Sequence, residues 1–457
     1  MPEPRTLLAP GAALLLATLL ALSLPAMTGF GTPAAAAEGP GDECVGTMTE
    51  QPDESTVVSI QGTELTDDGY EKRAALLVSY APDGTFEWAR NASAAGRWWA
   101  YDVDRLPNDN LLFVTTESGA SIVGELNPDS GEYEWKKRFD GPPDDAENPQ
   151  VTDAHDVDLI DGDELAIADK GEGHERLLVY NRTQGEVTWE WRFEDHPDHY
   201  PESGGGPPDD WTHVNDIDRV NVSESDAVDA TGEWFMASVR NFDQVVFVNR
   251  TSKAVELTLG EDGDHDVLHR QHNPDHLWGP DGEHTALVAD SLNDRVVEYA
   301  YDADSGSWER VWQVTGLNEP RDADRLPNGN TLVSDRMGHR VVEVTPEGEV
   351  VWEMYTPYET YDAERGGPGS EGPTMREQGV EGRYEVHGDA NFSEAEVDAC
   401  ADALYSFAPS RFDTFAGDLT GRDVHRGESL PLVPIAVGAL LVLVAAVGAI
   451  AYRRRSG

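Results

Sequence analysis

The chain has 457 residues, enough for one large domain or for two to three ordinary ones, and carries 87 Asp and Glu against 33 Lys and Arg. The formal net charge of −54 repels phosphate backbones, which excludes nucleic acid as a partner. A surface this acidic and poor in lysine indicates adaptation to concentrated salt, which screens charges beyond about 3 Å at 1 M. The alternative is a surface that binds cations.

The first 37 residues have the order of features typical of an export signal. Arg5 precedes an apolar run from Leu7 to about Leu24, and small residues follow up to Ala37. We therefore predict a signal peptide over 1–37 with cleavage near Ala37, the alternative being an anchor that is not cleaved.

A unit of strands and turns recurs between residues 55 and 355. Each copy predicts a strand x-D-h-D-h (h, apolar), a turn such as PNGN, two further strands, and a last strand that ends in Trp. The copies repeat every 50 residues or so, which predicts an all-β fold, a β-propeller with four strands in each blade. The first strands of five copies start at or beside these positions: Tyr101, His155, Asn215, His272 and Arg321. A less regular copy over 55–90 makes six blades, and five or seven blades stay open as alternatives.

The pattern stops after Trp352. Residues 356–429 are acidic and rich in Gly and Pro, which predicts a stalk, with a short helix at 393–407 and a strand or helix that could dock on the propeller. Residues 430–452 carry no charge and are long enough to cross about 30 Å of hydrocarbon as a C-terminal transmembrane helix. The arginines of the tail 453–457 place that tail in the cytoplasm and the propeller on the extracellular side of the cell membrane.

The two cysteines stand near the ends of the predicted folded region. In an exported protein Cys44 and Cys400 either form one disulfide or remain two separate thiols. Neither has the spacing of a metal-binding motif, so no metal is predicted from them.

Candidate functional residues fall on the predicted inner strands. The first strand of every blade lines the central channel, so equivalent positions converge around one axis. The residue before the first Asp of the pattern varies and is Tyr101, His155, Asn215 or Arg321. His272, and His213 two positions before Asn215, occupy the same neighbourhood. The recurrent aspartates are predicted to be structural and to bond to the backbone or to neighbouring blades; they are Asp102, Asp156, Asp216 and Asp322.

Converging histidines and arginine permit two kinds of chemistry. Three imidazoles with nearby carboxylates fit a transition metal, whereas an adjacent guanidinium fits a tetrahedral oxyanion such as sulfate or phosphate. No Ser or Cys has a recognisable nucleophile context, and imidazole can itself attack. We therefore predict group transfer through a covalent histidine, without a distinction between phosphoryl and sulfuryl groups.

The motifs H-D, H-x-N and Q-H on successive inner strands resemble those of the arylsulfate sulfotransferase family over residues 55–355, here in a membrane-anchored, salt-adapted form. The resemblance implies transfer of a sulfuryl group from a small aromatic sulfate ester to a phenolic acceptor, with no cofactor and no metal. It implies that His272 in RQHN is the nucleophile, and that His155 in AHDVD, His213 in HVND and Arg240 in ASVRNFDQVV support it. Asn215, Gln271 and Arg321 are the expected substrate-binding residues.

The sequence departs from the family near its start. Residues 38–54 are too few for the N-terminal β domain through which bacterial members dimerise, so the oligomeric state stays open. Two other functions fit the same propeller. One is a surface module that binds a glycan or a protein partner without turnover, and the other is a metal-dependent hydrolase.

Overall fold

The computed structural model describes residues 44–407, with gaps at 67–68, 74, 92–98, 118, 143–144, 172, 223–231, 368, 370–371 and 391, and residues 424–425. The chain divides into two units, 1–39 and 40–457, and every described residue belongs to the second. The predicted signal peptide and the predicted transmembrane helix lie outside the described residues. Within the described part, no helix has the length and apolar character needed to cross a membrane.

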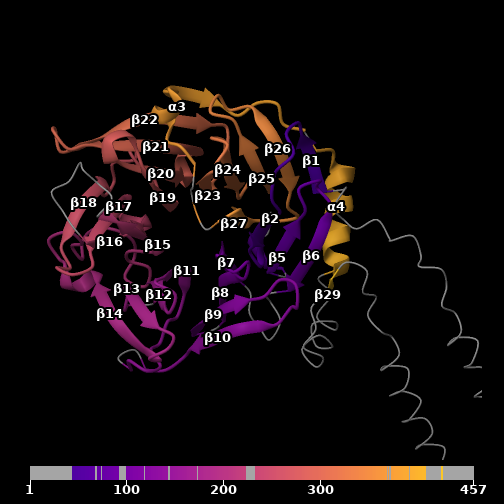
Figure 1. Ribbon diagram of the computed structural model, residues 1–457. Helices are drawn as coiled ribbons and strands as arrows, with labels where there is room; N and C mark the ends of the chain where they lie inside the picture. Colours follow the sequence, from indigo (N-terminus) through magenta and orange to yellow (C-terminus); the bar gives the residue numbers. More distant parts are fainter. Residues whose placement is uncertain are drawn as a thin grey trace, which may run out of the picture. The chain divides into compact units, whose positions relative to one another are not determined.

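Six antiparallel sheets stand around a common axis and form a six-bladed β-propeller, as predicted (Figure 1). The innermost strands are β7 (Trp99–Arg105), β11 (Ala154–Ile160), β15 (Val214–Asn221), β19 (His272–Trp278), β23 (Pro320–Arg325) and β27 (Thr360–Arg365). The second strands are β8 (Leu111–Glu117), β12 (Glu164–Asp169), β16 (Glu233–Val239), β20 (His284–Asp290), β24 (Thr331–Asp335) and β2 (Thr56–Ile60). The third are β9 (Ala120–Leu126), β13 (Arg176–Asn181), β17 (Gln244–Asn249), β21 (Arg295–Asp302), β25 (Arg340–Val344) and β5 (Leu76–Tyr80). The fourth are β10 (Tyr133–Phe139), β14 (Glu186–Arg192), β18 (Val255–Gly260), β22 (Ser307–Thr315), β26 (Val350–Tyr355) and β6 (Phe86–Asn91).

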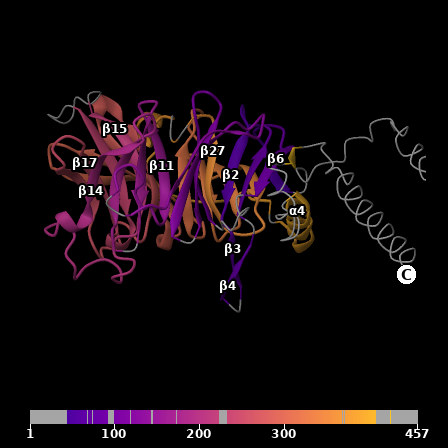
Figure 2. The same cartoon turned by 90° about the horizontal axis from the view of Figure 1, so that it is seen from below.

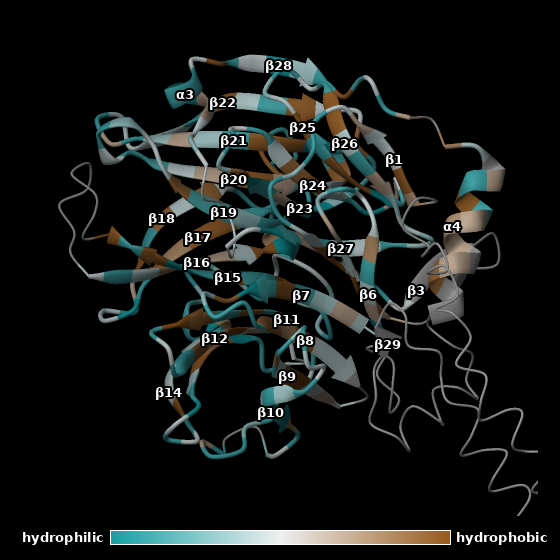
Figure 3. Ribbon diagram, turned by 45° about the vertical axis from the view of Figure 1, so that its right-hand side comes forward, coloured by the Kyte–Doolittle hydropathy of each residue, from teal (hydrophilic) through white to brown (hydrophobic). Residues whose placement is uncertain are grey.

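The core lies between the blades. Both faces of each sheet are covered by neighbouring blades, so the second and third strands are apolar along most of their length, whereas the loops are hydrophilic (Figure 3). Two tryptophans near the blade edges reach the next blade. The indole of Trp189 donates to the carbonyl of Arg250 at 2.7 Å, and that of Trp312 donates to the carbonyl of Pro346 at 2.7 Å.

Carboxylates also join neighbouring inner strands. Asp156 accepts the backbone N–H of Ile217 at 2.5 Å, and Asp322 accepts that of Ala363 at 3.4 Å. The predicted structural role of the recurrent aspartates is confirmed at these two positions.

The ring closes with strands from both ends of the chain. β27 is the inner strand of the blade that β2, β5 and β6 otherwise form, and β1 (Val45–Met48) adds to β26 of the last blade. The prediction that the propeller ends at residue 355 and a stalk begins at 356 is therefore wrong. Closure in this way pairs β2, near the start of the described residues, with β27, about 300 residues later, and leaves no blade without an inner strand.

Further segments after β27 also lie on the propeller. β28 (Gly382–Glu385) pairs in parallel with β22, and a short helix α3 (Met375–Gln378) precedes it. The predicted helix at 393–407 is confirmed as α4 (Glu394–Phe407). The two-residue strand β29 (Val424–His425) pairs with β6, and the hairpin of β3 (Thr63–Thr66) and β4 (Gly69–Lys72) projects from one face of the ring (Figure 2).

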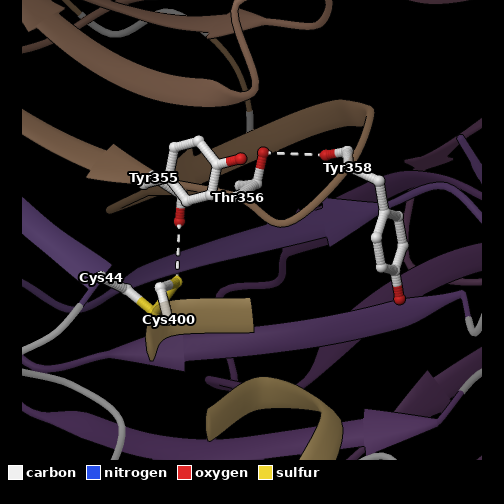
Figure 4. Close-up of a disulfide and its surroundings, with 5 residues drawn as sticks. All are labelled: Cys44, Tyr355, Thr356, Tyr358 and Cys400. Atoms are coloured by element: carbon white, nitrogen blue, oxygen red, sulfur yellow. Dashed lines mark hydrogen bonds between the residues drawn. A yellow bond between two sulfur atoms is a disulfide. The ribbon is translucent and has the colours of Figure 1, made fainter. Parts of the chain in front are cut away.

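Cys44 and Cys400 form a disulfide (Figure 4). Of the two predicted alternatives, a disulfide or two separate thiols, the disulfide is confirmed. It joins the residue before β1 to α4, across 356 positions of sequence, with the two Cα atoms 4.8 Å apart. Both cysteines are fully buried in the core cluster that surrounds Trp352. The disulfide thus ties α4 to the blade at which the ring closes.

Loss of this bond is expected to lower stability. Replacing Cys44 and Cys400 by serine should reduce the free energy of unfolding by about 2–4 kcal/mol, because the cross-link closes a very long loop in the unfolded chain. Denaturant unfolding of the double variant should match that of the reduced wild-type protein. Unchanged midpoints in both samples would contradict the expectation.

Candidate active site

The predicted convergence of side chains at one end of the channel is found in the structure. The starts of the inner strands carry Tyr101, His155, Asn215, His272 and Arg321, and β27 adds Tyr361, which lies within the predicted stalk. The Tyr101 ring stacks on His155 with centroids 4.0 Å apart, and His155 meets His213 edge to face at 5.0 Å. The ring centroid of Tyr361 lies 6.1 Å from that of His272 and 6.2 Å from that of His155, so the tyrosine ring contacts both histidines.

The orientation of His272 follows from its hydrogen bonds. Its Nδ1 lies 2.9 Å from the hydroxyl of Ser291 and 3.1 Å from the carbonyl of Arg270. The Ser291 hydroxyl donates its own proton to the carbonyl of Pro320 at 2.7 Å, so it accepts from His272. These bonds assign the ring proton to Nδ1 and leave the lone pair on Nε2. Nη1 of the Arg321 guanidinium lies at the edge of the same ring, in contact with Nε2 and 2.8 Å from Nδ1.

A lysine and two aspartates orient the other histidines. Nδ1 of His155 donates to the carbonyl of Asp153 at 3.2 Å, and Nδ1 of His213 donates to the carboxylate of Asp210 at 2.7 Å. The ammonium of Lys170 bridges both aspartates, at 3.0 Å from Asp153 and 3.3 Å from Asp210. In both rings Nε2 is left as the acceptor.

Two arginines bring positive charge to the histidines. Arg240 begins the 3-10 turn η4 (Arg240–Phe242), and its Nη1 donates to the side chain of Asn241 at 3.0 Å. The Nε atoms of Arg240 and Arg321 are buried without a hydrogen-bond partner. Burial lowers the pKa of Arg240 to about 10 and that of Arg321 to about 9, so both remain cations at neutral pH. We call these five residues the histidine–arginine cluster: His155, His213, His272, Arg240 and Arg321.

Burial keeps the imidazoles of this cluster neutral. It lowers the pKa of His155 to about 4 and holds that of His213 well below its usual range. The pKa of His272 is likewise well below its usual range because of burial, and then because of the charges of Arg321 and Arg240. A neutral imidazole keeps its lone pair, which is the form that attacks an electrophile.

Two predicted substrate-binding residues make contacts within the protein. The Gln271 amide donates to the hydroxyl of Ser238 at 3.2 Å and to the carbonyl of Gln244 at 2.7 Å, and the residue is fully buried. The Gln271 side chain thus joins two blades, and its contact with a substrate stays a prediction. Asn215 donates to the carbonyl of Gln271 at 3.1 Å, which fixes the chain just before His272.

In four of the blades, the residue that follows the second strand forms another level of the site. Lys170 follows β12, Arg240 follows β16, Ser291 follows β20 and Arg336 follows β24. The sequence contains the corresponding signal, since the repeats read ADK, SVR, ADS and SDR at this point. Alignment of the repeats at the second strand, and not only at the first, would have found Lys170 and Ser291.

The fold and the cluster define this protein as an all-β, six-bladed propeller with neutral imidazoles and guanidinium groups at one end of its channel. In the described residues, no group of three His, Cys, Asp or Glu side chains is arranged to hold a metal ion.

Comparison with known proteins shows likeness in fold alone. No known protein family and no curated protein matches the sequence. Among solved structures, a protein of unknown function from Bacteroides caccae is 14% identical, with a TM-score of 0.45 over 70% of this chain and 98% of that one. The periplasmic gluconolactonase of Pseudomonas aeruginosa is 14% identical, with a TM-score of 0.40 over 66% of this chain and 83% of that one. A streptogramin B lyase is 14% identical, with a TM-score of 0.35 over 56% and 69% of the two chains.

Proposed function

We propose that the protein is an aryl sulfotransferase that moves a sulfuryl group from a phenolic sulfate ester to a phenolic acceptor through a sulfohistidine at His272. The observation that carries the proposal is the arrangement around that ring. Ser291 holds the proton on Nδ1, and the free Nε2 faces the Arg321 guanidinium. A neutral nucleophile beside a cation suits attack on an anionic ester.

In the first half-reaction, Nε2 of His272 attacks the sulfur atom of the ester. The N–S bond forms, the bond between sulfur and the aryl oxygen breaks, and a phenolate leaves. The Arg321 and Arg240 guanidinium groups offer N–H donors to the sulfuryl oxygens and to the leaving oxygen. Arg321 must move from Nε2 onto the sulfuryl group for this, since the two groups are in contact. The ring keeps its Nδ1 proton, so the sulfated imidazole is cationic and Nε2 is a good leaving group.

In the second half-reaction, a phenol attacks the same sulfur atom. The new S–O bond forms, the N–S bond breaks, and Nε2 recovers its lone pair. His213 is suited to accept the proton of the phenol, because its Nε2 is free and Asp210 stabilises the resulting imidazolium. Because burial holds the pKa of His213 well below its usual range, the protonated ring then passes the proton to water and is neutral again before the next turnover. Asp210 is itself kept ionised, since the bonds from His213 and Lys170 outweigh its burial and lower its pKa.

The intermediate can be observed directly. The full-length protein is incubated with 4-nitrophenyl sulfate, quenched in alkali to protect an acid-labile N–S bond, and weighed intact by mass spectrometry. We expect a gain of one sulfuryl group, mapped by peptides to His272 and discharged by added phenol. 4-Nitrophenyl phosphate should leave the mass unchanged. Turnover without an adduct, or an adduct on another residue, would contradict the proposal, and binding without turnover would favour a recognition module.

The rate of formation of the adduct should depend little on pH near neutrality. A histidine with the ordinary pKa of about 6.5 is half protonated at pH about 6.5, so only half of the rings are in the neutral, nucleophilic form. The pKa of His272 lies well below this value, so the neutral form persists at lower pH. We expect the loading rate to stay constant from about pH 8 to below pH 6.5, measured by quenched flow and mass spectrometry. An inflection near pH 6.5 would show that the ring titrates normally.

With the predicted signal peptide and C-terminal helix, the reaction would take place outside the cell, on a propeller anchored in the membrane. The proposal requires neither a nucleotide donor nor a metal ion. Turnover that persists after dialysis against EDTA would be in accord with it, and loss of turnover that Zn²⁺ restores would favour the metal-dependent hydrolase.

A further inference from the structure

The inner strands carry acidic side chains at two successive inward positions beyond the histidine–arginine cluster. Alternate residues of a strand face the same side, so the pattern x-D-h-D places both acids in the channel. The first ring contains Asp102, Asp156, Asp216, Asp322 and Asp362, with Asn273 at the sixth position. The second ring contains Asp104, Asp158, Asp218, Asp275, Asp324 and Glu364.

These two rings line a cavity of about 250 Å³, which we call the acidic channel. Arg219, His276 and Gly369 complete its wall. The wall thus contains one arginine, Arg219, and eleven carboxyl groups. The charge of Arg105, which lies nearby, acts to lower the pKa of Glu364. Burial, followed by the charges of neighbouring carboxylates, raises the pKa of Asp102 and Asp216 well above the usual range. The ionised channel is thus destabilised by its own repulsion.

Several oxygen atoms in the wall have no hydrogen-bond donor. They include the amide oxygen of Asn273, whose residue is 8% exposed, and carboxylate oxygens of Asp216 and Glu364, whose residues are 5% and 4% exposed. Asn273 carries no charge, so the lack of a donor to its oxygen is an observation separate from the clustering of acidic side chains. A buried acceptor without a donor costs free energy, and native proteins supply a donor or an ion in nearly all such cases.

We propose that the acidic channel binds a hydrated Ca²⁺ ion. Its donors are carboxylate and amide oxygens, the hard ligands that Ca²⁺ prefers, and Ca²⁺ tolerates the irregular geometry that six independent strands provide. No three acidic or histidine side chains among the described residues already meet at one metal-sized point, so water completes the coordination shell. The cavity has room for several water molecules beside the ion.

The ion would hold the inner strands together at the end of the channel away from the cluster. It would offset the repulsion between blades where the two rings face one another, and it would touch none of the groups assigned to sulfuryl transfer. This inference is independent of the proposed function, and either can fail without the other.

The test is Ca²⁺ uptake by the full-length protein, measured by equilibrium dialysis and elemental analysis. A background of about 1 M KCl suppresses loose binding to the acidic surface, because charges are then screened beyond about 3 Å. The channel variant is Asp104→Asn with Asp218→Asn, two partly exposed acids for which no backbone bond is found. The control is Asp129→Asn with Glu347→Gln, which removes two exposed carboxylates from outer turns.

We expect the wild type and the control to hold roughly one Ca²⁺ per chain, and the channel variant to bind it about 10–100-fold more weakly, as for loss of groups that bind an ion through water. Ca²⁺ should raise the melting temperature of the wild type and the control but not that of the channel variant. Without Ca²⁺, the channel variant should be no less stable than the wild type, because repulsion is relieved. Asp218→Asn alone serves if the double variant does not fold.

Equal Ca²⁺ uptake by all variants would overturn the proposal. The proposal would also be overturned if additional KCl stabilised the wild type as much as CaCl₂ does at the same ionic strength. Screening of the carboxylates by salt would then explain the stabilisation without a bound ion.

Discussion

Replacing His272 by alanine is expected to lower turnover of 4-nitrophenyl sulfate by at least about 10³-fold and to abolish the covalent adduct. The effect is large because the substitution removes the atom that forms the N–S bond. The neighbouring imidazoles of His155 and His213 are each fixed through Nδ1 by their own partners and cannot take its place. Turnover is followed as release of 4-nitrophenolate, and the adduct by intact mass.

The matched control is His387→Ala, which removes an exposed imidazole next to β28. It should retain wild-type turnover and adduct formation. Because His272 is buried, His272→Ala must also keep its unfolding midpoint within a few degrees for the comparison to hold. Added imidazole should restore part of the turnover in His272→Gly, where the ring can be replaced from solution. Wild-type turnover in either variant without imidazole would remove His272 from the mechanism.

The residues at the starts of β11, β19 and β23 could be predicted from the sequence. In a closed propeller, equivalent positions of the repeats surround one axis and therefore lie close together. His155, His272 and Arg321 occupy the same position in three repeats, and that position alone places them around one axis. Tyr361 was missed although its segment TYDAER fits the inner-strand pattern. Its strand completes a blade whose other strands lie some 300 residues earlier, so the repeat is interrupted there.

The direction of each imidazole could not be predicted in the same way. It depends on Ser291, Asp153 and Asp210, which lie in turns and loops whose length differs between blades. Register along a strand fixes which residues line the channel, but the loop conformation fixes which ring nitrogen carries the proton. The left-handed backbone at His213 and Arg270, with φ of 49° and 51°, is a local feature of this kind. The acidic channel, in contrast, follows from the pattern x-D-h-D alone once six inner strands are known.

Replacing Arg321 by methionine is expected to lower turnover by roughly 10²–10³-fold, the usual cost of losing a donor that stabilises developing negative charge. Methionine keeps much of the volume but removes the guanidinium that contacts Nε2 of His272 and that meets the sulfuryl oxygens in the proposed mechanism. Arg321→Lys keeps the charge but loses the planar fork, so an intermediate loss is expected. Arg138→Met, which removes an exposed arginine paired with Asp140, is the control and should leave turnover unchanged.

A second measurement separates this role from simple loss of packing. After burial, the charge of Arg321 is the next cause that lowers the pKa of His272. Its removal should raise that pKa, so the acid limb of the loading rate should move to higher pH in Arg321→Met and stay in place in Arg321→Lys. A structural defect would lower the rate at every pH without moving the limb. If Arg321→Met loads His272 at the wild-type rate with an unmoved limb, the guanidinium acts on neither the ester nor the ring, and the sulfuryl oxygens must be held by Arg240.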